Sequence, residues 1–411
     1  MFSKMECKTF FKYFFLVILL YLYLNNPVFS VVGIGSIKFF YLLIPFTFIG
    51  KKFSSVIRLF RREKMLFIAL VVFSLIRTVL GGDIMVVYTH ITFFIENFLV
   101  AISLVVLISD LGFTNEQLNK SCMIVGCVGA IISMMCILNE SICDYVRYQL
   151  MDTAKDSLLY TVTYRGFGLS DSLSYGYGII QACLFVMCVY YLKQNKWAFL
   201  FYIPLLASIM LNARTGIVVF AACIVYMLIC SRKFSVLLSV VIGVSSLIYL
   251  APILLPYLGL SEDTLRWLLE FQEEMEGVAD SGSIRGSGTA DALLGRMVVL
   301  PSDFFEWIIG RGYIIFLTKG PNSDVGFFQQ LNYGGLSYVT ILSLLFIAFY
   351  KRMKQYRIDV FFIGFFFITF LIANLKGNYI FECGAFRFML LLYFFYIYSA
   401  HRNIYGRFKT C

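Results

Sequence analysis

The chain has 411 residues, of which 60% are hydrophobic and only 14% are charged, and its formal net charge is +10. Ordinary soluble domains carry about 25% charged residues, so this composition excludes a soluble globular protein. The apolar residues form runs long enough to cross a bilayer core of about 30 Å. Positive charge on such a chain is expected to meet anionic lipid, and no nucleic-acid partner is predicted.

Hydropathy predicts an all-α polytopic membrane protein, residues 1–411 forming a single integral membrane domain of about twelve transmembrane helices. The first apolar run resembles a signal peptide, but it lacks a small-residue cleavage site, so we interpret it as a retained signal anchor. In chain order the predicted spans are 10–25, 31–50, 65–82, 84–108, 121–138, 174–192, 197–212, 214–230, 235–257, 329–349, 358–375 and 384–400.

Lys and Arg crowd every second gap between the predicted spans, most densely at 51–64 and 351–357. This pattern predicts that both termini and the basic gaps face the cytosol. The two long loops, 139–173 and 258–328, then lie on the outer side of the membrane. Loops of this length are usually functional, so the chemistry is expected there.

The second long loop is acidic and is predicted to hold two short helices. Ser261 is a suitable N-cap for a helix that ends near Gly277. A second helix is predicted from Ala290 to Val299, ahead of Pro301. The apolar residues around Trp307 argue that the loop is ordered.

Two glycine-containing motifs flank predicted outer turns. The first runs from Tyr164 to Ser170 and includes Arg165 and Gly168. Arginine beside exposed backbone amides is suited to bind phosphate, although a flexible turn with an interfacial arginine explains the same residues. The second is Asn212–Gly216, where Arg214 marks either a binding site or a simple hairpin at the bilayer surface.

A third constellation leads from the long loop into the span 329–349. Arg296 comes first, Ile309–Tyr313 follows with Arg311, Gly312 and Tyr313, and Ser323–Phe328 supplies Asp324. The arginines offer fixed positive charge. Asp324 is interpreted either as a general base or as the cap of the next helix.

Four ionisable residues fall inside predicted spans: Lys38, Arg77, His90 and Glu96. Such residues are costly in lipid and are functional candidates by default. His90 is a candidate general base. A structural hydrogen bond between helices is an equally good explanation.

The order and spacing of these motifs, Arg165–Leu169, Asn212–Gly216, Ile309–Tyr313, Ser323–Phe327 and Gly334–Leu336, resemble bacterial O-antigen and capsular polysaccharide polymerases of the Wzy type. Related O-antigen ligases share the architecture, which is similar to the GT-C glycosyltransferases. Ligases usually carry a histidine in the outer loop before the late spans. This chain has none there, which favours a polymerase.

The resemblance implies glycosyl transfer at the periplasmic face of the bacterial inner membrane, within lipopolysaccharide or capsule biosynthesis. The donor and acceptor are expected to be oligosaccharide repeat units on undecaprenyl diphosphate, with a chain-length regulator as protein partner. We expect no cofactor and no divalent metal, since no D-x-D motif occurs. The expected catalytic residues are Arg165, Arg296, Asp324 and His90, and the expected substrate-binding residues are Arg214, Arg311, Arg77, Gly168, Gly312, Tyr164 and Tyr313.

Other functions remain open at this point. A lipid-linked oligosaccharide flippase or transporter has a similar number of spans, but such families generally keep their outer loops short. A non-catalytic membrane scaffold does not explain the arginine and glycine motifs. The long outer loops therefore favour an enzyme over both.

Overall fold

A computed structural model of the chain describes residues 4–29, 33–49, 51–150, 169–170, 175–191, 201–212, 214–231, 262, 266, 277, 280–283, 291–293, 295–315, 322–382 and 384–406. These residues are almost entirely α-helical, which confirms the all-α prediction. The strands among the described residues are β1 (Val28–Phe29) and β2 (Ile34–Gly35), which pair in a two-residue antiparallel ladder. The chain divides into two compact units, unit 1 with Met1–Lys38 and Glu116–Gly288, and unit 2 with Phe39–Asn115 and Thr289–Cys411.

Unit 1 is a helical unit in which α10 packs against both α11 and α12. Small residues allow close helix approach, because a side chain added at Gly126 would meet Leu184 and Leu205 at 3.0 Å. The helices of this unit are α1 (Lys4–Asn25), α7 (Asn115–Leu138, whose first residue belongs to unit 2), α8 (Glu140–Leu150), α10 (Tyr175–Tyr191), α11 (Tyr202–Asn212) and α12 (Arg214–Ser231).

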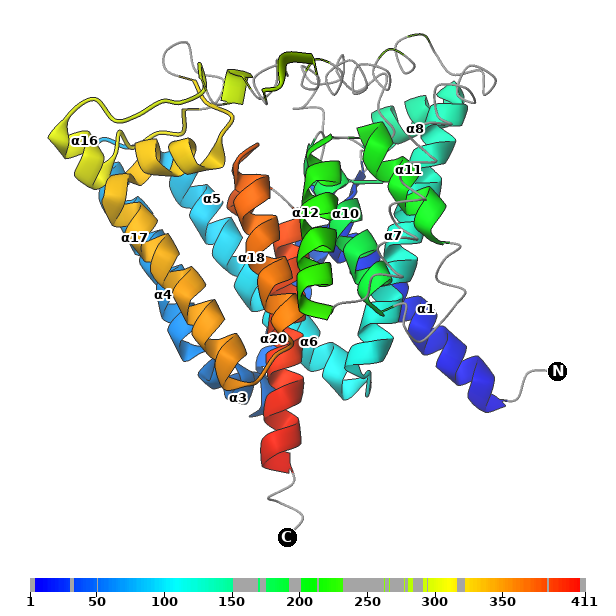
Figure 1. Cartoon of the computed structure of the whole chain (residues 1–411). Coiled ribbons are helices and arrows are strands. Elements are labelled where there is room, and N and C mark those ends of the chain that lie inside the picture. The colour runs from blue at the N-terminus through cyan, green and yellow to red at the C-terminus, as the bar shows by residue number, and fades with distance from the viewer. Residues whose placement is uncertain are drawn as a thin grey trace. The chain divides into compact units, whose positions relative to one another are not determined.

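Unit 2 is built around two long neighbours, α4 (Arg61–Val79) and α17 (Gly326–Gln355), which lie side by side in Figure 1. The 3₁₀ helix η1 (Ser36–Leu42) leads into the unit. The remaining elements are α2 (Leu43–Phe48), α3 (Lys51–Leu59), α5 (Ile84–Phe94), the π-helix η2 (Ile95–Val100), α6 (Ala101–Asp110), α16 (Phe304–Ile309), α18 (Val360–Asn374), α19 (Tyr379–Glu382) and α20 (Gly384–Gly406).

Three helices among the described residues are long and apolar enough to cross a membrane: Ile84–Asp110, Asn115–Leu138 and Gly326–Gln355. The first is the continuous run of α5, η2 and α6. Shorter apolar helices lie within five other predicted spans: Phe10–Asn25, Gly176–Tyr190, Tyr202–Asn212, Thr215–Cys230 and Val360–Asn374. The chain is therefore a membrane protein, and the number twelve stays a prediction.

One predicted span has a different structure. Residues 31–50 do not form a single straight helix, because β2, η1 and α2 follow one another there. The helical stretch Ser36–Phe48 also bends by 103° into Phe53–Leu59, and together they make a fourth span at most. Gly33 explains part of the break, since its φ of +63° is a left-handed conformation suited to a turn rather than a helix. The predicted span 235–257 lies outside the described residues.

The outer loops also differ from prediction. The first eleven residues after Asn139 form α8 instead of loop. The helix predicted from Ala290 to Val299 is wrong in its second half: 291–293 are helical, but 295–297 form a turn and 298–300 have no regular secondary structure. The structure instead places a helix, α16, at Phe304–Ile309. Asp303 caps it by accepting a hydrogen bond from the Glu306 amide at 2.8 Å.

The two ends of unit 2 carry different residues. At one end, which we call the basic end, Arg61, Arg62 and Lys351 line a common groove, and Arg402 donates to Ser109 at 3.3 Å. At the other, the glycine end, the α4–α5 turn at 80–83 meets residues 310–312. Predicted cytosolic gaps thus gather at one end and predicted outer gaps at the other, as the charge pattern requires.

A buried ion pair holds the basic end together. The Arg352 guanidinium donates to both carboxylate oxygens of Glu63, at 3.1 and 3.2 Å, and the Tyr393 hydroxyl donates to the same carboxylate at 2.9 Å. The Glu63 side chain is only 1% exposed. Three helices, α4, α17 and α20, are joined by this one carboxylate.

Candidate functional site

Helix α17 is broken at the glycine end. Gly335 has φ +60° and ψ −163°, which is not helical. The break frees the carbonyl oxygens of the preceding turn, and two loop amides satisfy them. Arg311 donates its amide to Asn332 O at 2.6 Å, and Gly312 donates to Tyr333 O at 2.9 Å. The Gly310–Gly312 segment is therefore docked on the break through its backbone.

Glycine is required in this segment for steric reasons. Gly310 and Gly312 have φ of +74° and +84°. A Cβ at Gly310 would overlap the carbonyl of Tyr333, and one at Gly312 would lie 2.8 Å from the Cα of Gly82. The glycines that the sequence marked as a ligand-binding motif thus serve close backbone packing.

Arg77 connects α4 to the same segment. Its guanidinium donates to Gly310 O at 2.8 Å and to Leu80 O at 3.2 Å, and the residue is only 6% exposed. The neighbouring turn adds a bond from the Asp83 amide to Gly312 O at 2.8 Å. Arg77 was predicted to bind substrate; in this structure its Nη atoms hold the α4–α5 turn against the loop.

Arg311 is likewise engaged within the protein. Its Nε donates to the Glu306 carboxylate at 3.0 Å, and its Nη2 donates to Leu300 O at 3.3 Å. Ser302 donates to the same carboxylate from its hydroxyl and its amide, and these bonds, with the nearby guanidinium, lower the pKa of Glu306. The predicted phosphate contact by Arg311 would have to compete with this carboxylate.

His90 lies on α5, six residues or about 9 Å along the helix from its first residue, Ile84. Its Nδ1 lies 2.7 Å from Val86 O and its Nε2 lies 2.8 Å from the Tyr338 hydroxyl. A carbonyl oxygen only accepts, so Nδ1 carries the proton and donates. In the neutral ring, Nε2 then accepts a hydrogen bond from the Tyr338 hydroxyl. Tyr333 stacks on the imidazole, with ring centroids 5.6 Å apart.

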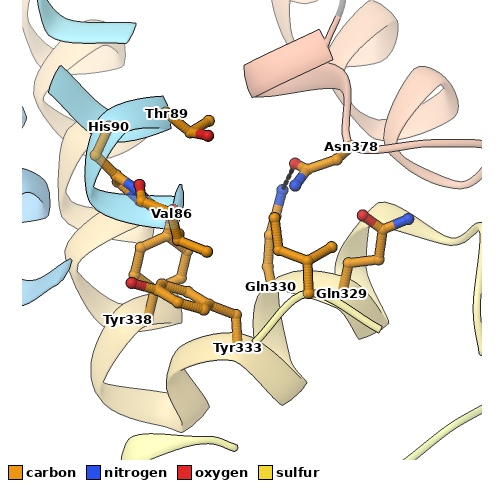
Figure 2. Close-up of a pocket in the computed structure, with 9 residues that line it drawn as sticks. Val86, Thr89, His90, Gln329, Gln330, Tyr333, Tyr338 and Asn378 are labelled. Atoms are coloured by element: carbon orange, nitrogen blue, oxygen red, sulfur yellow. Dashed lines mark hydrogen bonds between the residues drawn. The ribbon is translucent and has the colours of Figure 1, made fainter. Parts of the chain in front are cut away.

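Amide side chains face these rings across a pocket (Figure 2). Gln330 donates to Asn374 at 3.1 Å and to Asn378 at 3.0 Å. The pocket has about 250 Å³ of empty space, including the part that opens to solvent. Its lining consists of Val86, Thr89, His90, Ile314, Gln329, Gln330, Tyr333, Tyr338 and Asn378.

Two buried polar atoms of this pocket, the Tyr333 hydroxyl and Gln329 Oε1, lack a hydrogen-bond partner among the described residues. Buried polar groups are normally satisfied, and an exception calls for an explanation. Leaving such a group unpaired costs about 1–3 kcal/mol. A water molecule or a ligand hydroxyl in the pocket would satisfy such atoms, so the arrangement suits a small polar group.

Among the predicted site residues of unit 2, His90 alone belongs to the pocket lining. Gly312 and Tyr313 directly precede the lining residue Ile314, and Tyr313 is 40% exposed. The Ser323 hydroxyl donates to Met297 O at 2.6 Å, which brings the segments of the exposed Arg296 and the half-buried Asp324 together. Asp324 does not cap α17. Val325 occupies that position without a side-chain hydrogen bond.

Of the predicted site residues in unit 1, the structure describes only the backbone of Arg214. Tyr164, Arg165 and Gly168 lie outside the described residues. Arg214 is the first residue of α12, and its side chain is also outside them. Near Arg214, a Cβ at Gly216 would lie 2.6 Å from the carbonyl oxygen of Gly178. The start of α12 thus packs on the start of α10.

Most of the pocket was missed by sequence reasoning. The signal was available in the polar residues of the span 329–349, where Gln329 and Tyr333 are one helical turn apart and Gln330 faces the same way. Polar side chains inside an apolar run are expected to face the protein interior. Nothing in the sequence, however, links them to His90.

The apolar helices identify an all-α membrane protein. A buried polar pocket lies among the helices of its unit 2. Comparisons with protein-family models, curated proteins and solved structures find no match to this chain. Within the described part of the chain, no three of His, Cys, Asp and Glu gather in a way that would hold a metal ion.

Proposed function

We propose that this protein is a polysaccharide polymerase, a membrane glycosyltransferase that joins undecaprenyl-diphosphate-linked repeat units. The proposal includes about twelve spans in the bacterial inner membrane, cytosolic termini, and a pocket that faces the periplasmic side. Its main structural support is the pocket around His90, which combines an aromatic wall, amide groups and unsatisfied polar atoms. Its support from sequence is the resemblance to Wzy-type polymerases.

The pocket residues suit the handling of one sugar. Amide groups such as those of Gln329 and Asn378 bind sugar hydroxyls, and the buried ring of Tyr333 adds an aromatic wall. The space open to a water-sized molecule is only about 10 Å³, far below the usual 300–1,000 Å³ of ligand pockets, so a sugar enters only if the lining side chains move apart. We therefore assign it to the reacting hydroxyl-bearing sugar of the acceptor rather than to a whole repeat unit.

The proposed reaction is a displacement at the anomeric carbon of the growing chain. An acceptor hydroxyl oxygen forms the new bond to this carbon, while the bond to the diphosphate oxygen breaks. The acceptor proton passes to the Tyr338 hydroxyl as that group gives its own proton to His90 Nε2. Asp324 is the alternative base. The sequence resemblance assigns Arg165, Arg214 and Arg296 to the leaving diphosphate, whose negative charge they would neutralise.

The test is polymer formation by the purified protein in nanodiscs supplied with lipid-linked repeat units, read as a ladder on a gel. We expect His90→Gln, Tyr338→Phe and Arg296→Ala to remove the ladder while the protein stays monodisperse. Arg296→Lys and Arg165→Lys keep the charge and should retain part of the activity. Asp324→Asn separates the two bases, because it spares activity if His90 is the base.

A normal ladder from His90→Gln, Tyr338→Phe, Arg165→Ala and Arg296→Ala would contradict the proposal. In cells, deletion of the gene should reduce the surface polysaccharide from a ladder to a single repeat. Long polymer left on the lipid carrier would instead indicate a ligase. A chain-length regulator is expected to change the ladder's length distribution without being required for bond formation.

The break in α17 favours one second candidate, a flippase or transporter for lipid-linked oligosaccharide. Transporters commonly bind substrate where a membrane helix is interrupted, and α17 is interrupted at Gly335 beside the pocket. A flippase would move lipid-linked repeats across vesicles without forming any polymer. The nanodisc assay distinguishes the two, since it offers no second compartment and still requires a ladder from the enzyme.

A further inference from the structure

A second depression lies at the basic end of unit 2, far along α4 and α17 from the glycine end. It is a groove with about 1,000 Å³ of empty space, part of it open to solvent. Residues of α4 and α17 form it: Arg61, Arg62, Met65, Leu66, Leu344, Ile347, Ala348 and Lys351. The proposed glycosyl transfer uses none of them.

The groove has a net positive charge. Arg61, Arg62 and Lys351 line it and are exposed, and no carboxylate is among its lining residues. The acidic residue next in sequence, Glu63, points into the protein, where Arg352 and Tyr393 satisfy its carboxylate. The three lining charges are therefore available to an anion from outside.

The rest of the groove is apolar and continues along the helices toward the membrane interior. Met65, Leu344 and Ile347 are 55%, 48% and 46% exposed. They follow the basic residues by roughly one turn along α4 and precede Lys351 by about one to two turns along α17. A charged end and an apolar body are thus arranged along the direction in which a lipid lies.

We propose that this groove binds one anionic phospholipid, with its phosphate at Arg61, Arg62 and Lys351 and an acyl chain along Met65, Leu344 and Ile347. Arginine is suited to the phosphate because its planar group donates two parallel hydrogen bonds. The apolar wall selects a lipid over a soluble phosphate ester. Anionic lipid is also abundant on the cytosolic leaflet, where the charge pattern places this end.

The test compares retained lipid in two matched variants. The groove variant is Arg61→Gln, Arg62→Gln and Lys351→Gln. The control is Arg58→Gln, Lys64→Gln and Lys354→Gln, which removes the same charge nearby without touching the groove. Each protein is equilibrated in detergent with equal phosphatidylglycerol and phosphatidylcholine, repurified, and its bound lipid is measured by native mass spectrometry.

We expect wild type and control to retain one phosphatidylglycerol in preference to phosphatidylcholine. Each basic residue near an anionic lipid contributes about a fivefold factor in affinity, so the groove variant should lose roughly 100-fold. Equal retention in the groove variant and wild type, or an equal loss in the control, would overturn the proposal. If the groove variant fails to fold, wild type alone decides, because retention of both lipids equally refutes an anionic site.

Discussion

The two ends of unit 2 differ in whether their buried polar groups are hydrogen-bonded. At the basic end, Arg352 and Tyr393 donate to both oxygens of the Glu63 carboxylate and complete it. At the glycine end, the hydroxyl of Tyr333 and Gln329 Oε1 stay without partners beside a pocket. A satisfied group stabilises the fold, whereas an unsatisfied one costs stability and is retained for another reason. Under the proposed function, the basic end serves stability and the glycine end holds the site.

The largest effect is expected from breaking the Glu63–Arg352 ion pair at the basic end. Arg352→Ala leaves the buried Glu63 carboxylate with one donor, and removing one partner of a buried pair typically costs about 3–5 kcal/mol. We expect most of the protein to aggregate on extraction, measured as the monodisperse fraction by size exclusion. Glu116→Gln is the control, because it breaks the exposed pair with Lys120 and should cost less than about 0.5 kcal/mol. A stable Arg352→Ala protein would refute the structural role.

The second prediction tests the backbone contact between the Gly310–Gly312 segment and α17 at the glycine end. Gly310→Ala has to place a side chain at φ +74° against the Tyr333 carbonyl, so we expect a loss of more than about 2 kcal/mol. Gly81→Ala is a matched control, since Gly81 has φ +92° but open space around it, and only the backbone penalty of roughly 1 kcal/mol applies. Thermal denaturation in detergent measures both.

Equal losses in the two glycine variants would mean that the Gly310–Gly312 segment is not docked on the break of α17. A larger loss for Gly310→Ala, together with loss of polymer, would tie the shape of the pocket to this segment.

The third prediction separates stability from activity. Tyr333→Phe removes a buried hydroxyl that has no partner, so the stability should stay the same or rise by up to about 1 kcal/mol. Polymer formation should fall about tenfold, since the hydroxyl is proposed to bind sugar. Tyr393→Phe should do the reverse, lowering stability without a specific effect on turnover. Full activity in Tyr333→Phe would remove the pocket's proposed role.

The sequence predicted the helices well where an apolar run is uninterrupted, because a backbone in lipid has to satisfy its own hydrogen bonds. The prediction was wrong at 31–50, where hydropathy carries no information about the turn at Gly33. The site was harder still. His90 and Tyr338 are separated by 248 residues, and a pattern read along the chain does not pair them.

The arginines show a further limit of the same kind. Arginine beside glycine fits a phosphate site and a carbonyl clamp equally well, because both require donors close to an exposed backbone. Arg77 and Arg311 were interpreted as substrate ligands, and the structure engages them with Gly310 O and the Glu306 carboxylate. Only the position of acceptors elsewhere in the fold distinguishes the two.

The smallest predicted effect is a local response to pH at α16. Hydrogen bonds from Ser302 lower the pKa of Glu306 below its ordinary range. The folded-state pKa is thus below the unfolded value, so the carboxylate contributes stability above the unfolded pKa and loses it as the pH falls through the folded one. Acid should therefore loosen α16 and free Arg311 before the rest of the unit responds.

Trp307, on the same helix, reports this as a fluorescence change between neutral pH and about pH 3. Glu306→Gln cannot titrate and should give a flat profile in the same range. A pH response that persists in Glu306→Gln would assign the titration to another group. It would also refute the proposal that protonation of Glu306 releases Arg311.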